Sequence, residues 1–417
     1  MSLLKKKLSE TLPKQAEEVA KFVKDNADAK VSDVTLKQVY GGMRGVKGLV
    51  CDTSVVPPDK GLIIRGYPLK ELFDKLPEEV LWLLLTGDLP NDEELKDLKK
   101  DINDRSVPPE YVWKVLDSMP EDSHPMAMFN TAILSMQGES VFAKEYSKGL
   151  RKSEFWEFTL EDYLNVMAKL PAIAAYVYRK RFNKGERIEP RTDLDWGANF
   201  AHMTGLERSD GKFAKLLRLY MVLHSDHEGG NASAFSASVI NSTLSDLYYA
   251  ISGGLNALAG PLHGLANQNC LKWVLELMDK FGGTPSEQDL KDFTWDTLNK
   301  GNVIPGYGHA VLRVTDPRFT AFHEFGKEHM PDDPVFKTVS RMFHVVPDIL
   351  KQLEKVKDPY PNVDAGSGAL LYHFGMKELS FYTVLFSVSR AMGIGAQAVI
   401  ARGYGLPITR PKSMPTH

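Results

Sequence analysis

The chain has 417 residues, of which 43% are hydrophobic and 25% charged, and its formal net charge is −3. These values are ordinary for a globular enzyme with two or three domains, or with one large core and an attached lobe. The slight negative charge gives no global basic field, so we expect neither nucleic acid nor an anionic lipid surface as a partner. The two cysteines, Cys51 and Cys270, predict neither a disulfide framework nor a zinc ligand pair.

The N-terminal residues 1–7 carry no apolar run of signal-peptide length, and lysines followed by Glu10 are not typical of a transit peptide. The longest apolar runs, 80–85 and 170–177, are too short to cross a bilayer. We therefore expect no association with a membrane, and a chain that acts where it is made or after processing.

Helical periodicity dominates the chain, and strand signals are scarce. An amphipathic helix is expected over 8–28, whereas prolines and short β-branched runs over 54–66 indicate loops and a small sheet. Further helices are expected over 69–85, 93–103, 109–118, 125–136, 160–181, 213–224, 232–252 and 376–402. The pattern predicts an all-α protein.

Glycine and proline clusters divide the region 263–369 into shorter helices and more loops than its flanks contain. This predicts a large helical domain that begins with 1–262, a smaller lobe formed by 263–369, and a return to the large domain over 370–417. The last residues, from Gly403, contain three prolines and are expected to form an extended arm.

The stretch 253–267 is small and apolar except for one imidazole, His263, which lies between Pro261 and Gly264. Because a helical pattern begins at Leu265, His263 is expected at a helix start, where the helix dipole favours the neutral ring. A neutral imidazole can donate a hydrogen bond to a developing oxyanion. Packing beside a tight turn is the alternative.

The run HSDHEGGN places His224 and His227 three residues apart at the end of a helix. A metal site, a structural turn and polar contact with a ligand are all compatible with this spacing. Metal is the least favoured of these, because Gly229 and Gly230 end the helix at once and no matching third ligand motif follows.

The loop VIPGYGHAV puts bare backbone beside His309, which would let an adenine or pantetheine chain approach closely. In NVDAGSG, Asp364 offers a carboxylate in a turn of small residues, with helix capping as the alternative.

Arginines recur in the same half of the chain, and Arg390 and Arg410 are poorly explained as solvated surface charges. Buried guanidinium groups need anionic partners such as a di- or tricarboxylate. The arginines concerned are Arg313, Arg318, Arg390, Arg402 and Arg410.

The order HSDHEGGN, GPLHGLAN, PGYGHAV, DPRF, NVDAGSG, SRAMG and TRPKSM resembles the citrate synthase family in its longer, mitochondrial-like form. The resemblance covers essentially the whole chain, including YGGMRGVKGLV near the start. It implies an all-α, multi-helical fold with a large domain and a smaller mobile domain. It also implies an acyltransferase that condenses acetyl-CoA with oxaloacetate and hydrolyses citryl-CoA to citrate and CoA.

By position, the resemblance implies that Asp364 removes a methyl proton from the thioester. His263 would then donate a hydrogen bond to the thioester oxygen, and His309 would polarise the oxaloacetate ketone. The oxaloacetate or citrate clamp would consist of His227, Arg318, Arg390 and Arg410. Arg410 matches an arginine that the neighbouring subunit supplies, which implies a homodimer with a shared site.

The resemblance implies no metal and no cofactor, since the CoA thioester is a substrate. The location would be the cytoplasm for a bacterial chain and the mitochondrial matrix for a processed eukaryotic one. Residues expected on the CoA side are Arg44, Lys152, Val303, Ile304, Gly306, Tyr307, Gly308, Lys355, Lys357 and Asn362.

Two residues depart from the family pattern. Lys152 stands where an arginine is expected, so it keeps the charge but loses bidentate geometry. Gly366 stands where a histidine is usual, and a smaller side chain near Asp364 could widen the acyl pocket. This keeps a 2-methylcitrate synthase that uses propionyl-CoA as the alternative function.

Overall fold

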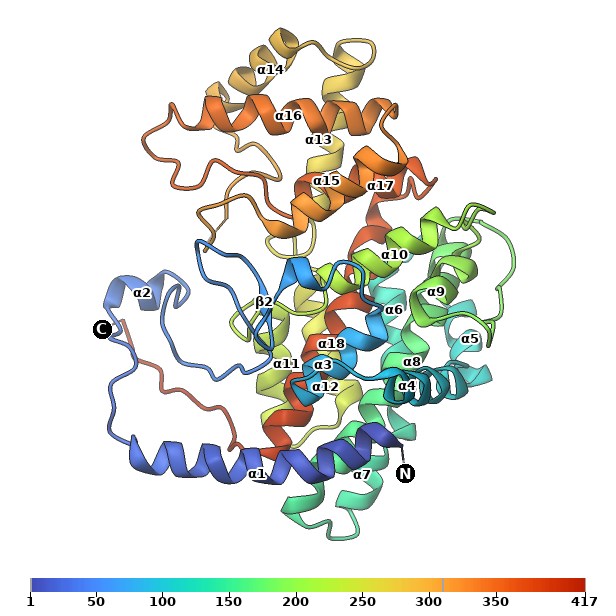
Figure 1. Ribbon diagram of the computed structural model, residues 1–417, viewed down its shortest axis with the longest axis vertical. Coiled ribbons are helices and arrows are strands. Elements are labelled where there is room, and N and C mark those ends of the chain that lie inside the picture. The colour runs from blue at the N-terminus through green and yellow to red at the C-terminus, as the bar shows by residue number, and fades with distance from the viewer. Residues whose placement is uncertain (1, 310, 417) are drawn as a thin grey trace.

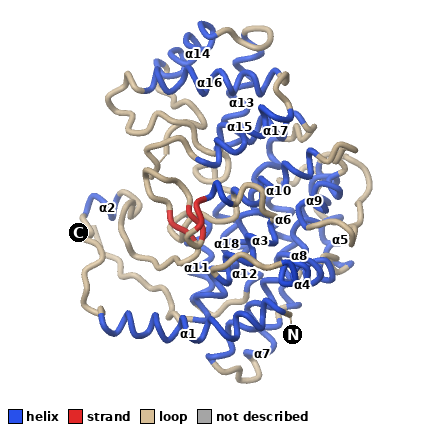
Figure 2. Tube along the Cα trace, viewed as in Figure 1, coloured by secondary structure: helices blue, strands red, loops and turns tan. Residues whose placement is uncertain are grey.

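A computed structural model describes residues 2–309 and 311–416 of the chain. Long helices pack side by side through most of the molecule, and the strands form one small patch near the centre of the view (Figures 1 and 2). The predicted all-α architecture is confirmed.

The larger body is built from α1 to α12 together with α18, which returns to it from the far end of the chain (Figure 1). These helices are α1 (Leu3–Asp25), α2 (Leu36–Tyr40), α3 (Pro77–Thr86), α4 (Asp92–Arg105), α5 (Glu110–Asp117), α6 (Pro125–Ser135), α7 (Val141–Tyr146), α8 (Phe155–Arg181), α9 (Trp196–Thr204), α10 (Lys212–Leu223), α11 (Ala232–Ser242), α12 (Leu247–Leu258) and α18 (Tyr382–Gly403).

Five helices, α13 to α17, pack mainly on one another at the top of Figure 1. They are α13 (Ala266–Lys280), α14 (Glu287–Asn299), α15 (Pro317–His329), α16 (Pro334–Leu350) and α17 (Asp364–His373). Short 3₁₀ turns punctuate the chain at η1 (Leu69–Glu71), η2 (Gln137–Glu139), η3 (Lys152–Glu154) and η4 (Leu379–Phe381).

The small sheet consists of β1 (Ser54–Val55), β2 (Ile63–Ile64) and β3 (Tyr67–Pro68), paired antiparallel in that order. Ser54 pairs with Ile64 and Ile63 pairs with Pro68. The sheet lies where the sequence predicted one, and it holds the 51–56 segment against the turn that follows α10.

The apolar helix α18 is the central helix of the larger body. It is long and apolar enough to cross a membrane by composition alone, but 83% of its most apolar window is buried inside the protein. Its start is six residues later than predicted, because residues 376–378 are irregular and the 3₁₀ turn η4 precedes the helix. Continuous burial explains why its sequence lacks a polar face.

The single helix predicted over 232–252 is wrong, because the structure contains two helices, α11 and α12. Leu244 has a φ of +66°, which ends α11. Asp246 then caps α12 by accepting hydrogen bonds from the backbone N–H groups of Tyr248 (3.0 Å) and Tyr249 (3.2 Å). An aspartate at an N-cap was therefore the missed signal.

Glu78 is a buried carboxyl group in α3 that helps to join α3 to α9. Its Oε1 accepts the Trp196 backbone N–H at 2.8 Å, whereas Oε2 has no partner among the described residues. Burial, with the nearby Asp195 charge adding to it, raises the pKa of Glu78 to about 7. The folded chain therefore holds a proton that the unfolded chain releases near the ordinary pKa of 4.5.

We expect the unfolding free energy to fall as pH rises from 4.5 through 7, because the folded state must then ionise Glu78. The full shift corresponds to roughly 3 kcal/mol at 1.36 kcal/mol per unit. Glu78→Gln should remove this component, so its stability relative to wild type should improve between pH 5 and pH 8. Denaturant unfolding at both pH values and one protein concentration checks this. An unchanged difference would contradict it.

Candidate active site

The three predicted catalytic side chains come from three separate segments. His263 lies in the turn between α12 and α13, His309 in the loop before α15, and Asp364 is the first residue of α17. Arg390 acts electrostatically on both His263 and Asp364, and Arg318 acts on both His309 and Asp364. The structure thus gathers the three groups around two arginines.

The His263 ring is held by Ser233, near the start of α11. The Ser233 backbone N–H donates to Nε2 at 3.2 Å, and the Ser233 hydroxyl lies 2.9 Å from the same nitrogen. Because Nε2 accepts from a backbone N–H, the proton of the neutral ring is on Nδ1. Burial, followed by the Arg390 charge, lowers the pKa of His263 to about 4. The ring is therefore neutral because it is partly buried beside a cation.

His309 is fixed in a similar way by its own loop. Its Nδ1 accepts the backbone N–H groups of Val311 (3.0 Å) and Leu312 (2.9 Å), so the proton of the neutral ring is on Nε2. Burial and then the Arg318 charge lower the pKa of His309 to about 4. The His227 ring lies 5.7 Å away between centroids, and its buried Nε2 has no partner among the described residues.

Asp364 is not a side-chain helix cap. The N-cap of α17 is Val363, without a side-chain cap, and the backbone N–H of Asp364 donates to Asn362 Oδ1 at 3.0 Å. The capping alternative is therefore wrong. Burial raises the pKa of Asp364 to about 6, and the opposing charges of Arg318 and Arg390 do not cancel this effect.

Two of the five arginines singled out in the sequence face this site from buried positions. Arg318 donates to both oxygens of Asp316, and Arg390 donates to the His224 carbonyl (3.3 Å) and to Asn231 Oδ1 (3.1 Å). Arg390 also stacks over Phe386 at 4.8 Å. The prediction that Arg390 is not a solvated surface charge is confirmed.

The other three arginines lie elsewhere. Arg402 is buried near the end of α18 and donates to the carbonyls of Asn241 and Ser245. Arg313 and Arg410 are exposed, and Arg410 lies on the extended C-terminal arm, which the proline pattern predicted. The described chain therefore does not bring Arg410 to its own site.

The loop 303–308 is pinned against the segment that leads into α17. Gly308 N–H donates to the Tyr360 carbonyl (3.0 Å), and Asn362 N–H donates to the Gly306 carbonyl (2.9 Å). The Asn362 side-chain amide donates to the Gly308 carbonyl at 2.9 Å, so Asn362 braces the loop. Gly306 has a φ of +81°, and a Cβ there would lie 2.8 Å from Cys270 Sγ and 2.9 Å from Ala365 Cα. No larger residue fits.

The remaining residues predicted on the CoA side are scattered. Three of them belong to the loop just described. Val303 is 79% exposed, Ile304 is buried, and Tyr307 forms an isolated antiparallel β-bridge with Pro361. Lys355 and Lys357 are exposed on the connection from α16 to α17. Arg44 is exposed in the turn after α2, and Lys152 is exposed in η3, where a Cβ built on Gly405 would lie 3.0 Å from Lys152 Cε. The structure brings the loop to Asp364, but not Arg44 or Lys152.

Gly366 does not open space toward the catalytic groups. A Cβ at this position would lie 3.3 Å from Phe319 Cδ2 and 3.4 Å from Phe322 Cβ. Those rings of α15 already fill the direction in which a larger side chain would project. The sequence argument for a widened acyl pocket at Gly366 is therefore not supported by the packing.

The two histidines of HSDHEGGN, His224 and His227, have different environments. His224 Nδ1 lies 3.0 Å from the Tyr220 carbonyl, and the ring stacks on Tyr220 at 4.1 Å, whereas His227 faces His309. Asp226 accepts from Thr53 (2.5 Å), Ser54 (2.8 Å) and Gln397 (2.8 Å), which pins the turn to the larger body. Among residues 2–309 and 311–416, no group of three potential metal ligands gathers.

Sequence reasoning missed two supporting residues. Asp316 was detectable, because an aspartate followed by Pro317 at a helix start is a capping signature, and Asp316 accepts from the Arg318 backbone N–H at 2.9 Å. Ser233 carried no such signal. It is one of several serines in α11, and only the fold brings it to a ring 30 positions along the chain.

Comparisons with known proteins identify the family of the chain. The family model described as "Citrate synthase, C-terminal domain" matches residues 42–412. A curated relative, "Citrate synthase, mitochondrial" of Saccharomyces cerevisiae, is 46% identical over 99% of this chain and 88% of its own length. "Citrate synthase 4, mitochondrial" of Arabidopsis thaliana is 45% identical over 99% of this chain and 88% of its own length.

Solved structures give the same result. The citrate synthase of Pyrobaculum aerophilum aligns with a TM-score of 0.80 and 30% identity over 90% of this chain and 92% of its own. That of Thermotoga maritima aligns with a TM-score of 0.75 and 28% identity over 92% of this chain and 96% of its own. The chain belongs to the citrate synthase family. These relatives support citrate synthase as the function and give no support to 2-methylcitrate synthase.

Proposed function

We propose that this acyltransferase makes citrate with Asp364 as the base, His263 as the donor to the thioester oxygen and His309 as the donor to the oxaloacetate ketone. Asp364 takes a proton from the acetyl methyl group, and the methyl carbon then forms a bond to the ketone carbon. Water cleaves the resulting citryl thioester to citrate and CoA. The single observation that carries this proposal is the gathering of one base and two neutral, tautomer-fixed imidazoles around Arg318 and Arg390.

The charges suit these steps. A thioester α-carbon is a far weaker acid than a carboxyl group, and each pKa unit of mismatch costs about 1.4 kcal/mol. A carboxylate alone does not close that gap, but a preorganised donor at the oxygen contributes about 3–4 kcal/mol. With Nε2 of His263 occupied by Ser233, the free Nδ1–H is that donor. Nε2–H of His309 plays the equivalent part at the ketone.

Thiol release tests the function itself. The purified chain should release CoA from acetyl-CoA only when oxaloacetate is present, and much faster than from propionyl-CoA. Because Phe319 and Phe322 fill the space beside Gly366, Gly366→Ala should leave the acetyl-to-propionyl ratio unchanged. No oxaloacetate-dependent release would refute citrate synthesis, and a preference for propionyl-CoA would restore the 2-methylcitrate alternative.

The same chemistry predicts an acid limb in the pH dependence. Asp364 must be ionised to act as a base, and its pKa is raised to about 6. His263 and His309, lowered to about 4, stay neutral over pH 5–8 and add no limb there. We expect kcat/KM for acetyl-CoA to rise with pH to a midpoint near 6 and then level off. Initial rates between pH 5 and 8.5 check this, and a flat profile would contradict it.

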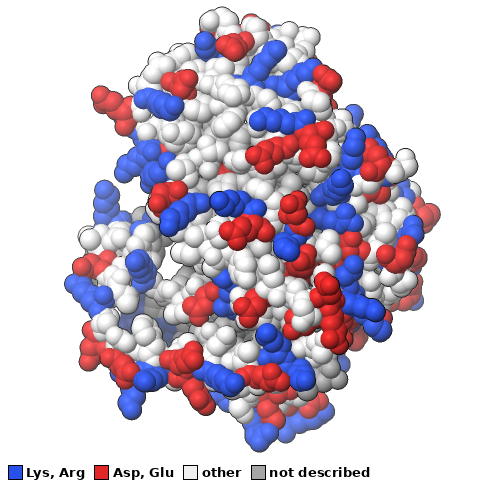
Figure 3. Space-filling view, viewed as in Figure 1, with Lys and Arg blue, Asp and Glu red and all other residues white. Residues whose placement is uncertain are grey.

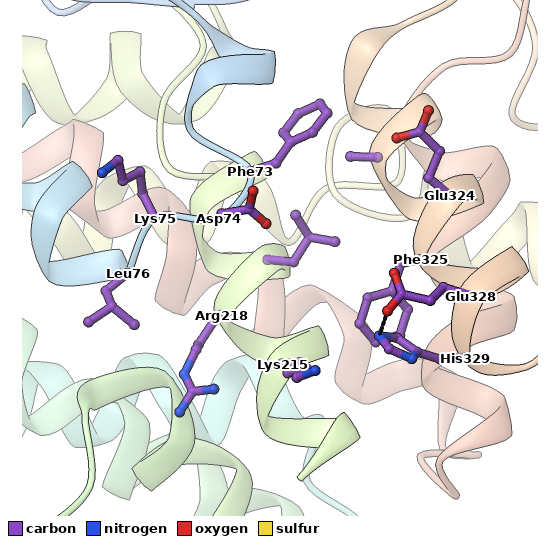
Figure 4. A pocket seen from close by; sticks show the side chains of 12 residues that line it. Phe73, Asp74, Lys75, Leu76, Lys215, Arg218, Glu324, Phe325, Glu328 and His329 are labelled. Carbon is purple, nitrogen blue, oxygen red and sulfur yellow. Dashed lines mark ion pairs between the residues drawn. The ribbon is translucent and has the colours of Figure 1, made fainter.

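We also propose that the lobe 263–369 moves against the larger body. A cavity of about 410 Å³ separates α15 from the 73–76 segment and α10, as Figure 4 shows. On one wall Arg218 forms an ion pair with Asp195 at 2.6 Å, and on the other the His329 ring lies 3.6 Å from the Glu328 carboxyl group. Loose packing at this end of α15 leaves room for a closure that excludes water from the site.

We further propose a homodimer in which Arg410 completes the partner's site. The segment 26–50 and the C-terminal arm leave the helical body on the same side (Figure 1), and Tyr40 donates to Thr416 at 3.2 Å. Large apolar side chains are exposed on both segments, including Val31 (72%), Val50 (69%) and Ile408 (58%). On the face in Figure 3, acidic and basic side chains are interspersed, so apolar contact is the expected driving force.

Co-expression of Asp364→Asn and Arg410→Ala chains tests the shared site. Each homodimer should be nearly inactive, whereas every heterodimer should hold one site with both Asp364 and a partner arginine intact. Random pairing should restore about a quarter of wild-type activity. No restoration would show that Arg410 acts in its own chain, and an active Arg410→Ala homodimer would show that Arg410 does not act in catalysis.

The two curated relatives named above, from Saccharomyces cerevisiae and Arabidopsis thaliana, are described as mitochondrial. On that support we propose the mitochondrial matrix as the location of this chain. Fractionation of the source cells tests it.

A further inference from the structure

The starts of α13 and α17 carry two of the proposed catalytic groups, and the two helices pack closely there. His263 lies three residues before α13, and Asp364 is the first residue of α17. A Cβ built on Gly368 would lie 2.5 Å from Asn267 Oδ1 and 3.1 Å from Leu271 Cβ. Glycine at 368 therefore lets α17 approach α13 at the side chain of Asn267.

Asn267 makes a buried link across this contact. Its side-chain amide donates to the Ser367 hydroxyl at 2.6 Å, and both residues are buried, with Asn267 5% exposed. The Ser367 hydroxyl in turn donates toward the Val363 carbonyl at 3.5 Å. Val363 directly precedes Asp364. A chain of polar contacts thus runs from α13, four residues after His263, to the peptide that carries Asp364.

This link has a cost in stability. Asn267 Oδ1 is buried without a partner among the described residues, which is destabilising. Leucine or alanine at both positions would avoid that penalty. What distinguishes this polar pair is its place beside two proposed catalytic groups, where a local cost in stability is expected in exchange for geometry.

Asn267 also lies close to a residue of the larger body, Tyr220. The Tyr220 ring of α10 is buried. Burial is the main cause that raises the pKa of the Tyr220 hydroxyl, and the charge of Asp364 adds to it. A hydrogen bond from the Asn267 side chain and the charge of Arg390 lower that pKa. The Asn267 side chain is therefore close to the Tyr220 hydroxyl as well as to the Ser367 hydroxyl.

We propose that Asn267 is a positioning residue for catalysis, which sets the place of the Asp364 carboxylate relative to His263 through its hydrogen bond to Ser367. This inference rests on the roles proposed above for Asp364 and His263. Proton transfer from a carbon acid depends steeply on that placement, because a misplacement of about 1 Å costs about 100-fold in rate. Binding of oxaloacetate, which relies on His227 and the arginines, does not depend on it.

Asn267→Ala and Ser367→Ala, singly and together, test this. Asn267→Ala should lower kcat for citrate formation about 10- to 100-fold. The dissociation constant of oxaloacetate, measured by calorimetry, should change less than about threefold, because the clamp is intact. The double variant should lose no more than Asn267→Ala alone, since both substitutions break one link.

Asn130 provides a matched control. It is also a buried asparagine, 4% exposed, and the Ser252 hydroxyl donates to its Oδ1 at 3.3 Å, but it joins α6 to α12, and neither of its partners, Met126 and Ser252, is a proposed site residue. Asn130→Ala should lower the thermal midpoint while leaving kcat within about twofold of wild type, as expected for a change that touches no proposed site residue.

A loss of kcat in Asn267→Ala but not in Asn130→Ala, with oxaloacetate binding retained, supports the proposal. A folded Asn267→Ala with near-wild-type kcat, or with equal losses in kcat and oxaloacetate affinity, overturns it. If Asn267→Ala does not fold, Ser367→Ala decides by the same criteria. A wild-type chain without oxaloacetate-dependent thiol release would refute the proposed function first, and this inference with it.

Discussion

Asp364→Asn is expected to lower kcat for citrate formation by about 10³-fold, the range over which a general base contributes. The amide has nearly the same shape as the carboxyl group but cannot take a proton from the acetyl methyl group. The fold should be retained, because the hydrogen bond to Asn362 is made by the backbone N–H of residue 364. The substitution also replaces a carboxyl group whose ionised form is disfavoured by burial.

The measurement is kcat by thiol release, together with the dissociation constant of oxaloacetate. The latter should change less than about threefold, since the arginine clamp is untouched. Asp162→Asn is a matched control, because burial also raises the pKa of Asp162 to about 6, but its partners are Ser140 and Val141 in the larger body. Comparable losses in both variants would mean that Asp364 has a structural role.

His263→Ala is expected to lower kcat by about 10²- to 10³-fold, the usual effect of removing one oxyanion donor. Loss of the ring removes the Nδ1–H that would stabilise negative charge on the thioester oxygen. Oxaloacetate binding should change little, because Arg318, Arg390 and His227 do not depend on this ring. The pH midpoint near 6 should persist in the residual activity, since Asp364 still supplies the base.

His323→Ala is a matched control for this variant. The His323 ring is also buried, its Nε2 lies 3.0 Å from the Ser340 hydroxyl, and burial lowers its pKa to about 4. His323 faces other helices of the smaller lobe and is not expected to contact substrate. If His323→Ala lost as much kcat as His263→Ala, packing and not hydrogen-bond donation would explain the effect of His263.

The sequence predicted the helical architecture and most helix positions because periodicity and capping residues act locally. It missed the break between α11 and α12, where a leucine at residue 244 adopts a left-handed conformation that leucine rarely takes. It also predicted that Arg390 is buried, because a charge inside an apolar helix has no solvated face. All of these predictions, right or wrong, depend on residues that are neighbours within one or two helical turns.

The contacts within the site could not be predicted from the sequence alone, because they depend on the tertiary fold. Ser233 and His263, or Asn267 and Ser367, are partners only because distant helices pack together, and nothing local distinguishes them from other small polar residues. Gly366 shows the converse error. Its small size suggested space near Asp364, but Phe319 and Phe322 come from another helix and occupy that space. Packing partners at long sequence distance therefore decide what a substitution means.

The central claim is that Asp364 takes a proton from the acyl methyl group, and isotope exchange tests this step alone. Acetyl-CoA is incubated with the protein in D₂O, with a dicarboxylate that fills the oxaloacetate site but lacks a ketone, and deuterium in the methyl group is followed by mass spectrometry. Wild type should catalyse incorporation, His263→Ala should do so slowly, and Asp364→Asn should not exceed the rate without protein. Incorporation by Asp364→Asn at the wild-type rate would contradict the account.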